Sequence, residues 1–210
     1  MGQEPDWLLW AREIQATAQT GLAFSRDPYD LDRYQALMGL AARIMAEHTS
    51  ADLGLIESLF GQEAGYATPK LGVRAAVFDD DGRILMVRET ADDHRWTIPG
   101  GWADVNQTAA QSVVREVWEE SGYDVRPVKL AAAWDKATQG LVLGPFSITT
   151  LFFICEPTGG EATTSLETSE IGWFAEDDIP SDLSMRRINP RQIARMYAHW
   201  RDRSLPTEFD

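Results

Sequence analysis

The sequence predicts an α/β domain preceded by a small all-helical domain, because the spacing of its apolar residues changes between residues 62 and 70. Before the change, apolar side chains recur every three or four residues, as they do along one face of a helix. After it, they form short runs separated by turn residues, a pattern typical of strands. We therefore predict a helical N-terminal domain over residues 1–62, a linker over 63–70 and a second domain over 71–210.

The first domain is expected to contain two long helices and a short third helix that begins near Asp52. Between the long helices, the segment "GLAFSRDPYD" indicates a loop, since it contains Gly21 and Pro28. We expect Trp7 and Trp10 to pack in a core or an interface rather than to bind a ligand. A unit this small exposes an apolar face unless it packs on something, so it should dock on the rest of the chain or on a second copy.

The second domain interleaves strands with two helices, which indicates an α/β or α+β fold. The run "LGVRAAVFDDDGRILMVRE" is expected to form a β-hairpin with its turn at Asp81-Gly82. Further strands are expected over residues 125–133, 147–155 and 171–174. Asn189 followed by Pro190 predicts the start of a terminal helix, because these residue types favour the N-cap and first helical positions.

The charge balance bears on possible partners. Nineteen basic and thirty-three acidic side chains give a net charge of −14. A field of this sign repels polyanions, which argues against an extended nucleic-acid-binding surface. A small phosphorylated substrate stays compatible with it, since divalent cations can invert the charge at one site.

The single cysteine and the absence of apolar spans indicate where the protein works. Cys155 has no partner for an intrachain disulfide, and we expect it to be an inert core residue. No apolar run approaches the length of a membrane span, and the first residues, "MGQEPDW", lack the regions of a secretion signal. We expect a cytoplasmic protein with no membrane association.

A helix rich in carboxylates is predicted just after a glycine-rich loop. Thr108 and Gln111 have the spacing of a capping box, which places the helix start at about Ala109. Gly122 is well placed to end the helix. Gln107 then lies just outside it.

Three glutamates, Glu116, Glu119 and Glu120, share an arc about 100° wide on this helix, since successive residues are about 100° apart. The face expected to be buried consists of Ala110, Val114, Val117 and Ser121. Such a compact group of carboxylates suits hard divalent cations, which prefer oxygen ligands. A solvated acidic face is the alternative that spacing alone leaves open.

The stretch from Gly101 to Tyr123 resembles the Nudix box, G-x5-E-x7-R-E-U-x-E-E-x-G-U, where U is a bulky apolar residue. All defined positions but one match, and Gln107 stands where the box has its first glutamate. The resemblance extends over residues 70 to 205. It implies an α/β/α sandwich with a mixed sheet and a hydrolase that cleaves a nucleoside diphosphate linked to another moiety.

The resemblance also implies roles for individual residues. The metal ligands would be Glu116, Glu119, Glu120 and the backbone carbonyl of Gly100. The ion would be Mg²⁺, for which Mn²⁺ could substitute. Catalysis would involve Glu116, Glu119 and Arg115, with one further acid from outside the box. Glu161, Glu167 and Glu170 are open candidates for that acid, Glu170 being carried forward as catalytic. The residues expected to bind substrate are Trp102, Arg88 and Arg95; an aromatic near the glycine loop could stack on a base or contact a quaternary ammonium.

The helical first part, together with "GYATPK" and "PGGWADV", is similar to bacterial Nudix enzymes with a helical N-terminal domain, among them CDP-choline pyrophosphatases. This similarity implies a homodimer and a small nucleotide substrate, CDP-choline first, which would yield CMP and phosphocholine. ADP-ribose, a sugar nucleotide or an RNA end are the alternatives. An alternative of another class is a non-catalytic nucleotide sensor, but a sensor should have lost metal-binding glutamates, and all three remain.

Overall fold

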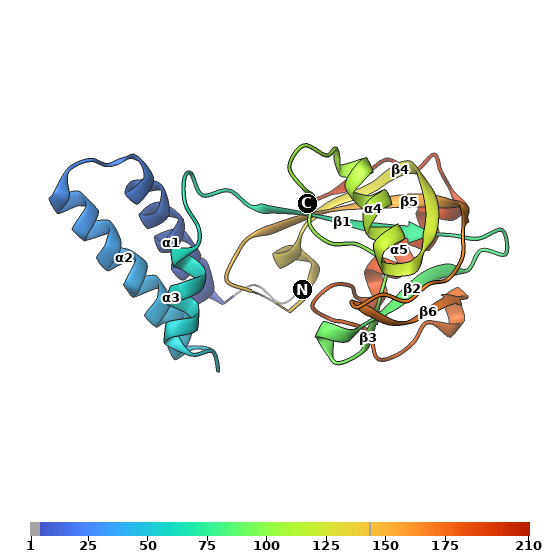
Figure 1. Cartoon of the computed structure of the whole chain (residues 1–210), viewed down its shortest axis with the longest axis horizontal. Helices are drawn as coiled ribbons and strands as arrows, with labels where there is room; N and C mark the ends of the chain where they lie inside the picture. Colours follow the sequence, from blue (N-terminus) through green and yellow to red (C-terminus); the bar gives the residue numbers. More distant parts are fainter. Residues whose placement is uncertain (1–4, 143) are drawn as a thin grey trace. The chain divides into compact units, whose positions relative to one another are not determined.

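The computed structural model describes residues 5–142 and 144–210. Residues 1–4, which begin both the predicted helical domain and the segment "MGQEPDW", lie outside the described residues. The chain divides into two compact units (Figure 1), the first containing the residues up to Pro69 and the segment Gly144–Ser147. The other described residues form the second unit. The boundaries predicted from the sequence did not foresee that a segment of the second half of the chain belongs to the first unit.

The described residues of the first unit form three helices: α1 (Asp6–Phe24), α2 (Pro28–Glu47) and α3 (Leu53–Gly61). Asp52 caps α3, as expected, because its side chain accepts a hydrogen bond from the Leu55 amide. The expected loop "GLAFSRDPYD" is wrong in its extent, since α1 continues through Gly21. A Cβ on Gly21 would lie 2.4 Å from the Tyr34 ring, so this glycine permits close packing of two helices rather than a break.

The two tryptophans of α1 differ in their surroundings. Trp7 stacks on His48 with ring centroids 4.8 Å apart. Trp10 is 58% exposed.

No helix in the described part of the chain is long and apolar enough to cross a bilayer.

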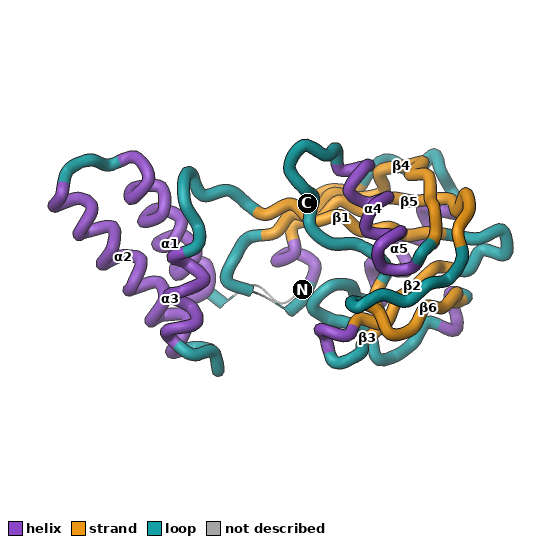
Figure 2. The backbone as a smooth tube through the Cα atoms, in the orientation of Figure 1, coloured by secondary structure: helices purple, strands orange, loops and turns teal. Residues whose placement is uncertain are grey.

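Strands form two sheets in the described part of the second unit (Figure 2). The first sheet has the order β1 (Lys70–Val77), β5 (Ile148–Gly160), β4 (Tyr123–Asp135) and β7 (Glu208–Phe209). It is mixed, because β1 pairs with β5 and β7 with β4 in parallel, while β4 and β5 are antiparallel. The second sheet is antiparallel, with the order β3 (Arg95–Thr97), β2 (Ile84–Glu89) and β6 (Thr168–Phe174). Three short 3-10 helices complete the unit: η1 (Thr90–Asp92), η2 (Lys136–Gln139) and η3 (Glu176–Asp178).

The expected hairpin over residues 71–89 is wrong. Its turn exists, since the Gly82 amide donates to the Asp79 carbonyl and the Asp79 amide to the Arg83 carbonyl, but pairing of the two runs ends at the isolated bridge Phe78–Ile84. Beyond that bridge the runs belong to different sheets. Both runs are buried almost throughout, and fully buried strands can belong to two different layers. The sequence pattern shows only that a turn connects the two runs, not that they pair.

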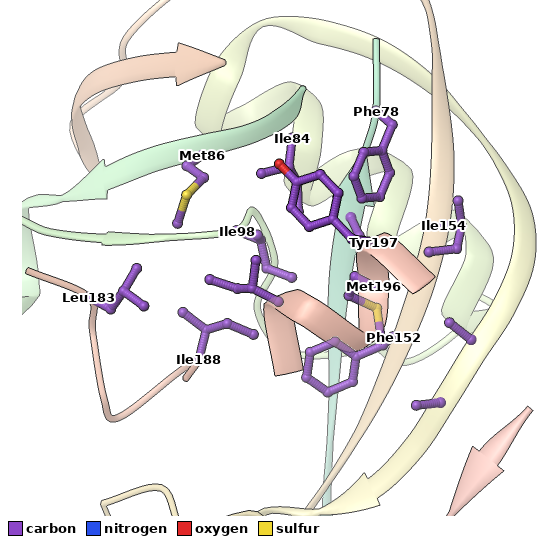
Figure 3. Packing of buried hydrophobic residues seen from close by; sticks show 14 of the residues in the cluster. Phe78, Ile84, Met86, Ile98, Phe152, Ile154, Leu183, Ile188, Met196 and Tyr197 are labelled. Carbon is purple, nitrogen blue, oxygen red and sulfur yellow. The ribbon is translucent and has the colours of Figure 1, made fainter. Parts of the chain in front are cut away.

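Helices α4 (Ala109–Ser121) and α5 (Pro190–Arg201) cover opposite faces of the mixed sheet, because successive residues of β1 point to opposite sides. Val73, Ala75 and Val77 pack with Val113 and Val117 of α4. Ala76 and Phe78 belong to the cluster on the α5 side, where Met196 and Tyr197 lie (Figure 3). This layering is the α/β/α sandwich that the resemblance implies. Cys155 lies within the α4-side core, and burial raises the pKa of its thiol to about 12, as expected of an inert residue.

Both helices begin with the capping boxes that the sequence indicates, and the two caps should differ in their contribution to stability. The exposed Thr108 accepts from the Gln111 amide at 3.2 Å. The buried Asn189 accepts from the Gln192 amide at 2.9 Å and also donates to the Gln139 carbonyl at 2.8 Å. Thr108→Ala should lower the free energy of unfolding by about 1 kcal/mol. Asn189→Ala should cost about 2–3 kcal/mol, because it also leaves a buried carbonyl without its donor. Urea unfolding of both variants checks this, and equal losses would contradict it.

Candidate functional site

The loop between β3 and α4 carries two glycines and lies against β1. The Val73 amide donates to the Gly101 carbonyl at 2.9 Å. Gly100 has a φ of 146°, and a Cβ there would come within 2.1 Å of the Val73 carbonyl oxygen. A Cβ on Gly101 would lie 2.6 Å from Oε2 of Glu116. Both positions therefore require glycine, one for the approach of β1 and the other for the approach of a carboxylate.

The three glutamates of α4 do not form one exposed cluster. Glu116 and Glu120 are buried on the inward face, whereas the Glu119 side chain is 46% exposed. The buried face expected from the sequence is wrong for Ala110, which is exposed, and Val113 is buried in addition. The inward face thus combines valines with two carboxylates, and the carboxylates can be buried there because hydrogen-bond donors meet them.

Those donors come from the loop and from the helix itself. The Gly100 amide donates to Oε2 of Glu120 at 2.9 Å, and Nη2 of Arg115 donates to Oε1 of Glu116 at 2.9 Å. Burial raises the pKa of Glu120 to about 7, although the charge of Arg74 and the bond from Gly100 oppose the rise. Burial likewise raises the pKa of Glu116 against the opposing charge of Arg115.

Arg115 connects the exposed and the buried parts of this cluster. Its Nη1 donates to Glu119 at 2.6 Å, and its Nη2 also lies 3.1 Å from Oδ2 of Asp104. Partial burial opposes the charge of Arg115, but the carboxylates of Glu116, Glu119 and Asp104 outweigh it and raise the pKa of the guanidinium. Arg115 therefore contacts three carboxylates, and the orienting role that the resemblance implies stays a prediction.

Gln107 retains a supporting contact despite its missing charge. Its Oε1 accepts hydrogen bonds from Nε of Arg115 and from Oγ of Ser112, both at 3.3 Å. A glutamate in this place would make a charge-assisted bond to Arg115, and the amide makes a weaker neutral one. Gln107 thus still contacts Arg115, the residue that pairs with Glu116 and Glu119.

A divalent metal ion fits the groups around the glycine loop. Among residues 5–142 and 144–210, no three His, Cys, Asp or Glu side chains form a ready metal-binding group. Two carboxylates, Glu116 and Glu120, and the Gly100 carbonyl would instead share an ion with oxygens of water and substrate. Mg²⁺ commonly takes such a set, with few protein ligands and several waters. The absence of a side chain at position 101 supports this fit, because it lets the Glu116 carboxylate lie directly against the loop that carries the Gly100 carbonyl.

A cavity of about 590 Å³ opens beside these residues, a volume within the range of small-molecule sites. The glycine loop and the α4 glutamates line it, as does Trp102, which is 54% exposed. Other lining residues come from η2, from the segment before β6 and from the loop before α5: Lys136, Leu166, Glu167, Arg186 and Arg187. Trp102 is therefore placed where a substrate base or headgroup could meet it.

Several residues predicted to act at the site lie elsewhere. Glu170 is opposite Arg88 in the register of β6 with β2, and the two form an ion pair at 2.9 Å. Arg88 also pairs with Asp182 at 2.8 Å. None of these residues lines the cavity, nor does Arg95. This placement weighs against the roles predicted for Glu170, Arg88 and Arg95, because strand pairing turns them toward one another or toward solvent.

The other candidates from the sequence also separate. Glu167 lines the cavity, and its charge contributes to the raised pKa of Glu120, whereas Glu161 is not among the lining residues. Trp96, the neighbour of Arg95 in the sequence, is buried and packs edge-on against Phe174, so it belongs to the core. Of the three acids outside the box, the geometry favours Glu167.

The charged cavity residues that sequence reasoning missed include Arg74, Glu89, Lys136 and Arg187. One of them left a signal. Arg74 interrupts the apolar run "LGVRAAVF", and a charge inside a buried strand commonly marks a functional or paired group. The other three depend on loops and strand ends whose positions the sequence pattern does not give.

Metal binding to this site should release a proton near neutral pH. If Glu120 has a pKa of about 7 in the metal-free protein, an ion must displace its proton below that pH. The affinity for Mg²⁺ should therefore change little above pH 8. Below pH 7 it should decrease with falling pH, approaching a tenfold loss for each pH unit. Isothermal titration in two buffers of different ionisation enthalpy measures both affinity and proton release. Equal affinities from pH 6 to pH 8 would contradict the assignment.

Comparison with known proteins finds family models and relatives that match most of the chain. Residues 5–60 match a family model described as a UDP-X-like N-terminal oligomerisation domain, and residues 68–196 match the NUDIX domain. A Bacillus subtilis (strain 168) protein, YjhB, provisionally named an ADP-ribose pyrophosphatase, is 40% identical over 204 residues, covering 97% of each chain.

Two solved structures are also similar. An ADP-ribose pyrophosphatase from Streptococcus suis 89-1591 is 38% identical with a TM-score of 0.61, over 68% of this chain and 100% of that one. A UDP-X diphosphatase is 27% identical with a TM-score of 0.63, over 98% of each chain. These matches do not confirm the resemblance to CDP-choline pyrophosphatases. They do show the family, and the chain belongs to the Nudix hydrolases, with a helical N-terminal region ahead of the Nudix domain.

Proposed function

We propose that this Nudix pyrophosphohydrolase uses Mg²⁺ to cleave the diphosphate of a nucleoside diphosphate sugar, with ADP-ribose as the first candidate. The observation that carries the proposal is the buried pair Glu116 and Glu120 beside the Gly100 carbonyl, at the edge of a cavity large enough for a nucleotide. A non-catalytic sensor would have no need to bury two carboxylates, since burying charge costs free energy.

The order of candidate substrates comes from the relatives. Two of those reported above are named for ADP-ribose, at 40% and 38% identity, and one for UDP-X, at 27%. CDP-choline, expected from the helical first part, is ranked behind them, because none of the three carries its name. A UDP-linked sugar is the second candidate, since the UDP-X diphosphatase matches along the full length of the chain.

The residues divide the work as follows. Glu116, Glu120 and the Gly100 carbonyl would hold Mg²⁺, which when bound lowers the pKa of an attacking water and neutralises charge on phosphate oxygens. Arg115 fixes Glu116 and Glu119 in place through hydrogen bonds. Glu167 lines the same cavity and is our candidate for accepting the proton of the water. Trp102, exposed at the cavity, is the candidate for contacting the base.

The same proposal includes a homodimer formed through the helical unit, a cytoplasmic location and no role for extended nucleic acid. An oligomer is supported by the match of residues 5–60 to an oligomerisation domain. Light scattering of the full chain tests the dimer, and a monomeric mass would contradict it. The cytoplasmic location rests on the single cysteine and stays a prediction.

A substrate panel tests the chemistry. With Mg²⁺, ADP-ribose should yield AMP and ribose 5-phosphate, faster than UDP-glucose and CDP-choline yield their monophosphates, as measured by anion-exchange chromatography and ³¹P NMR. Chelation with EDTA should abolish turnover, because water activation depends on the ion. If CDP-choline is the preferred substrate, the proposed substrate class is wrong and the chemistry stands. Turnover unaffected by EDTA would contradict the metal site itself, and no turnover on any compound would favour a sensor.

A further inference from the structure

The cavity concentrates positive charge in a chain that is otherwise acidic. Five of the nineteen Lys and Arg residues line it, namely Arg74, Arg115, Lys136, Arg186 and Arg187. Six acids line it as well: Glu89, Asp104, Glu116, Glu119, Glu120 and Glu167. The cavity is thus nearly balanced, whereas the chain carries a net charge of −14. Since the acids of α4 belong to the metal site, the cations outside that helix need an explanation of their own.

Arg74 is a buried cation that no carboxylate of the described residues contacts directly. It is 7% exposed, and its Nη1 donates to the carbonyls of Ile98 at 3.2 Å and Gly100 at 2.5 Å. Within residues 5–142 and 144–210, Arg74 has no ion pair to an acidic side chain shorter than 4 Å. Burial lowers the pKa of Arg74, and the more distant charges of Glu120 and Glu116 oppose that effect. Buried arginines ordinarily have a direct counter-ion, so this one is available to an anion in the cavity.

Arg187 lies on a loop whose backbone is fixed. Its neighbours Leu183 and Ile188 are buried and point into the core on the α5 side (Figure 3). The Ser184 amide donates to the Trp96 carbonyl at 2.8 Å, and the Arg187 amide donates to the Ser184 carbonyl at 2.8 Å. A side chain on such a backbone is positioned before any ligand arrives, which lowers the entropic cost of binding.

The two arginines lie near enough to affect each other. Burial first, and then the charge of Arg74, lower the pKa of Arg187 to about 10, so Arg187 stays protonated at neutral pH. In the part of the chain that the structure describes, Arg187 pairs with one acidic side chain, the buried Glu89, to which it donates a hydrogen bond. Two cations and one anion leave this wall of the cavity with a positive charge. Guanidinium groups present paired N–H donors whose spacing matches the oxygens of a phosphate.

We propose that Arg187 and Arg74 form a phosphate-binding wall that holds the non-bridging oxygens of the substrate's diphosphate, while the glutamates of α4 hold the metal ion. The inference rests on the proposed function in one respect, that the anion is a diphosphate. It adds two residues from outside the Nudix box, one on β1 and one on the loop before α5. The competing account is that Arg187 merely neutralises Glu89.

The experiment separates these accounts with a double variant. Imidodiphosphate, which resists hydrolysis, is titrated calorimetrically in the presence of Mg²⁺ into the full chain. Arg187→Gln should weaken its binding about 10- to 100-fold, the loss expected for charge-assisted hydrogen bonds, and raise KM similarly. Arg187→Lys should recover part of the affinity, because lysine restores the positive charge but not the paired N–H donors of the guanidinium. The affinity for Mg²⁺ alone should not change in either variant.

Glu89→Gln combined with Arg187→Gln removes the ion pair as a whole, so that no buried carboxylate is left unpaired and folding is protected. This double variant should keep the binding defect of Arg187→Gln. Arg126→Gln, which breaks the exposed pair with Glu156 away from the cavity, is the matched control and should bind like the original protein. If the double variant regains the original affinity, or if Arg187→Gln loses no more than Arg126→Gln, Arg187 is only a counter-ion and the proposal is overturned.

The outcome for this wall is distinguishable from the outcome for the proposed function. If the original protein hydrolyses a nucleoside diphosphate sugar but Arg187→Gln leaves KM and imidodiphosphate binding unchanged, the wall fails and the function stands. If nothing is hydrolysed but imidodiphosphate binds through Arg187, the function fails and the wall stands. No binding of imidodiphosphate to the original protein would also overturn the wall.

Discussion

The burial of two carboxylates beside a glycine loop is the constraint on which the rest of the Nudix domain depends. Glu116 and Glu120 lose most of their hydration, which costs several kcal/mol for an unpaired charge in a protein interior. Arg115, the Gly100 amide and the nearby charge of Arg74 offset part of that cost. A raised pKa at Glu120 is what remains, and a divalent ion is the ligand that would satisfy the pair.

The fold provides the two features that this burial needs. The loop follows β1 closely because Val73 bonds to Gly101 and because position 100 has no side chain to clash with the strand. Strands β1 and β2, which flank the turn at Gly82, belong to different sheets. Strand β1 is therefore covered by α4 on one face and by the α5-side core on the other. That core anchors the loop carrying Arg187, so the glutamates and the arginines of the cavity both lie on backbone that is fixed by packing and hydrogen bonds.

Local chemistry allowed much of this to be predicted from the sequence. The caps of α4 and α5 follow from Thr108 and Asn189, and the Nudix box gave the family, because these features depend on residues close together in the chain. The rotation of α4 could not be predicted, since a carboxylate and a valine compete for the inward face and distant donors decide between them. The choice between Glu170 and Glu167 could not be made from the sequence either, because it depends on strand register. The register of β6 with β2 places Glu170 opposite Arg88, whereas Glu167 lies at the cavity.

The most direct test of the central claim compares the three glutamates of α4 as metal ligands. Electron paramagnetic resonance of Mn²⁺ measures the free ion and hence the affinity of Glu116→Gln, Glu119→Gln and Glu120→Gln. Because only Glu116 and Glu120 are buried beside the Gly100 carbonyl, their variants should lose at least about tenfold in affinity, and Glu119→Gln should lose clearly less. Equal losses in all three variants, or the largest loss in Glu119→Gln, would contradict the account.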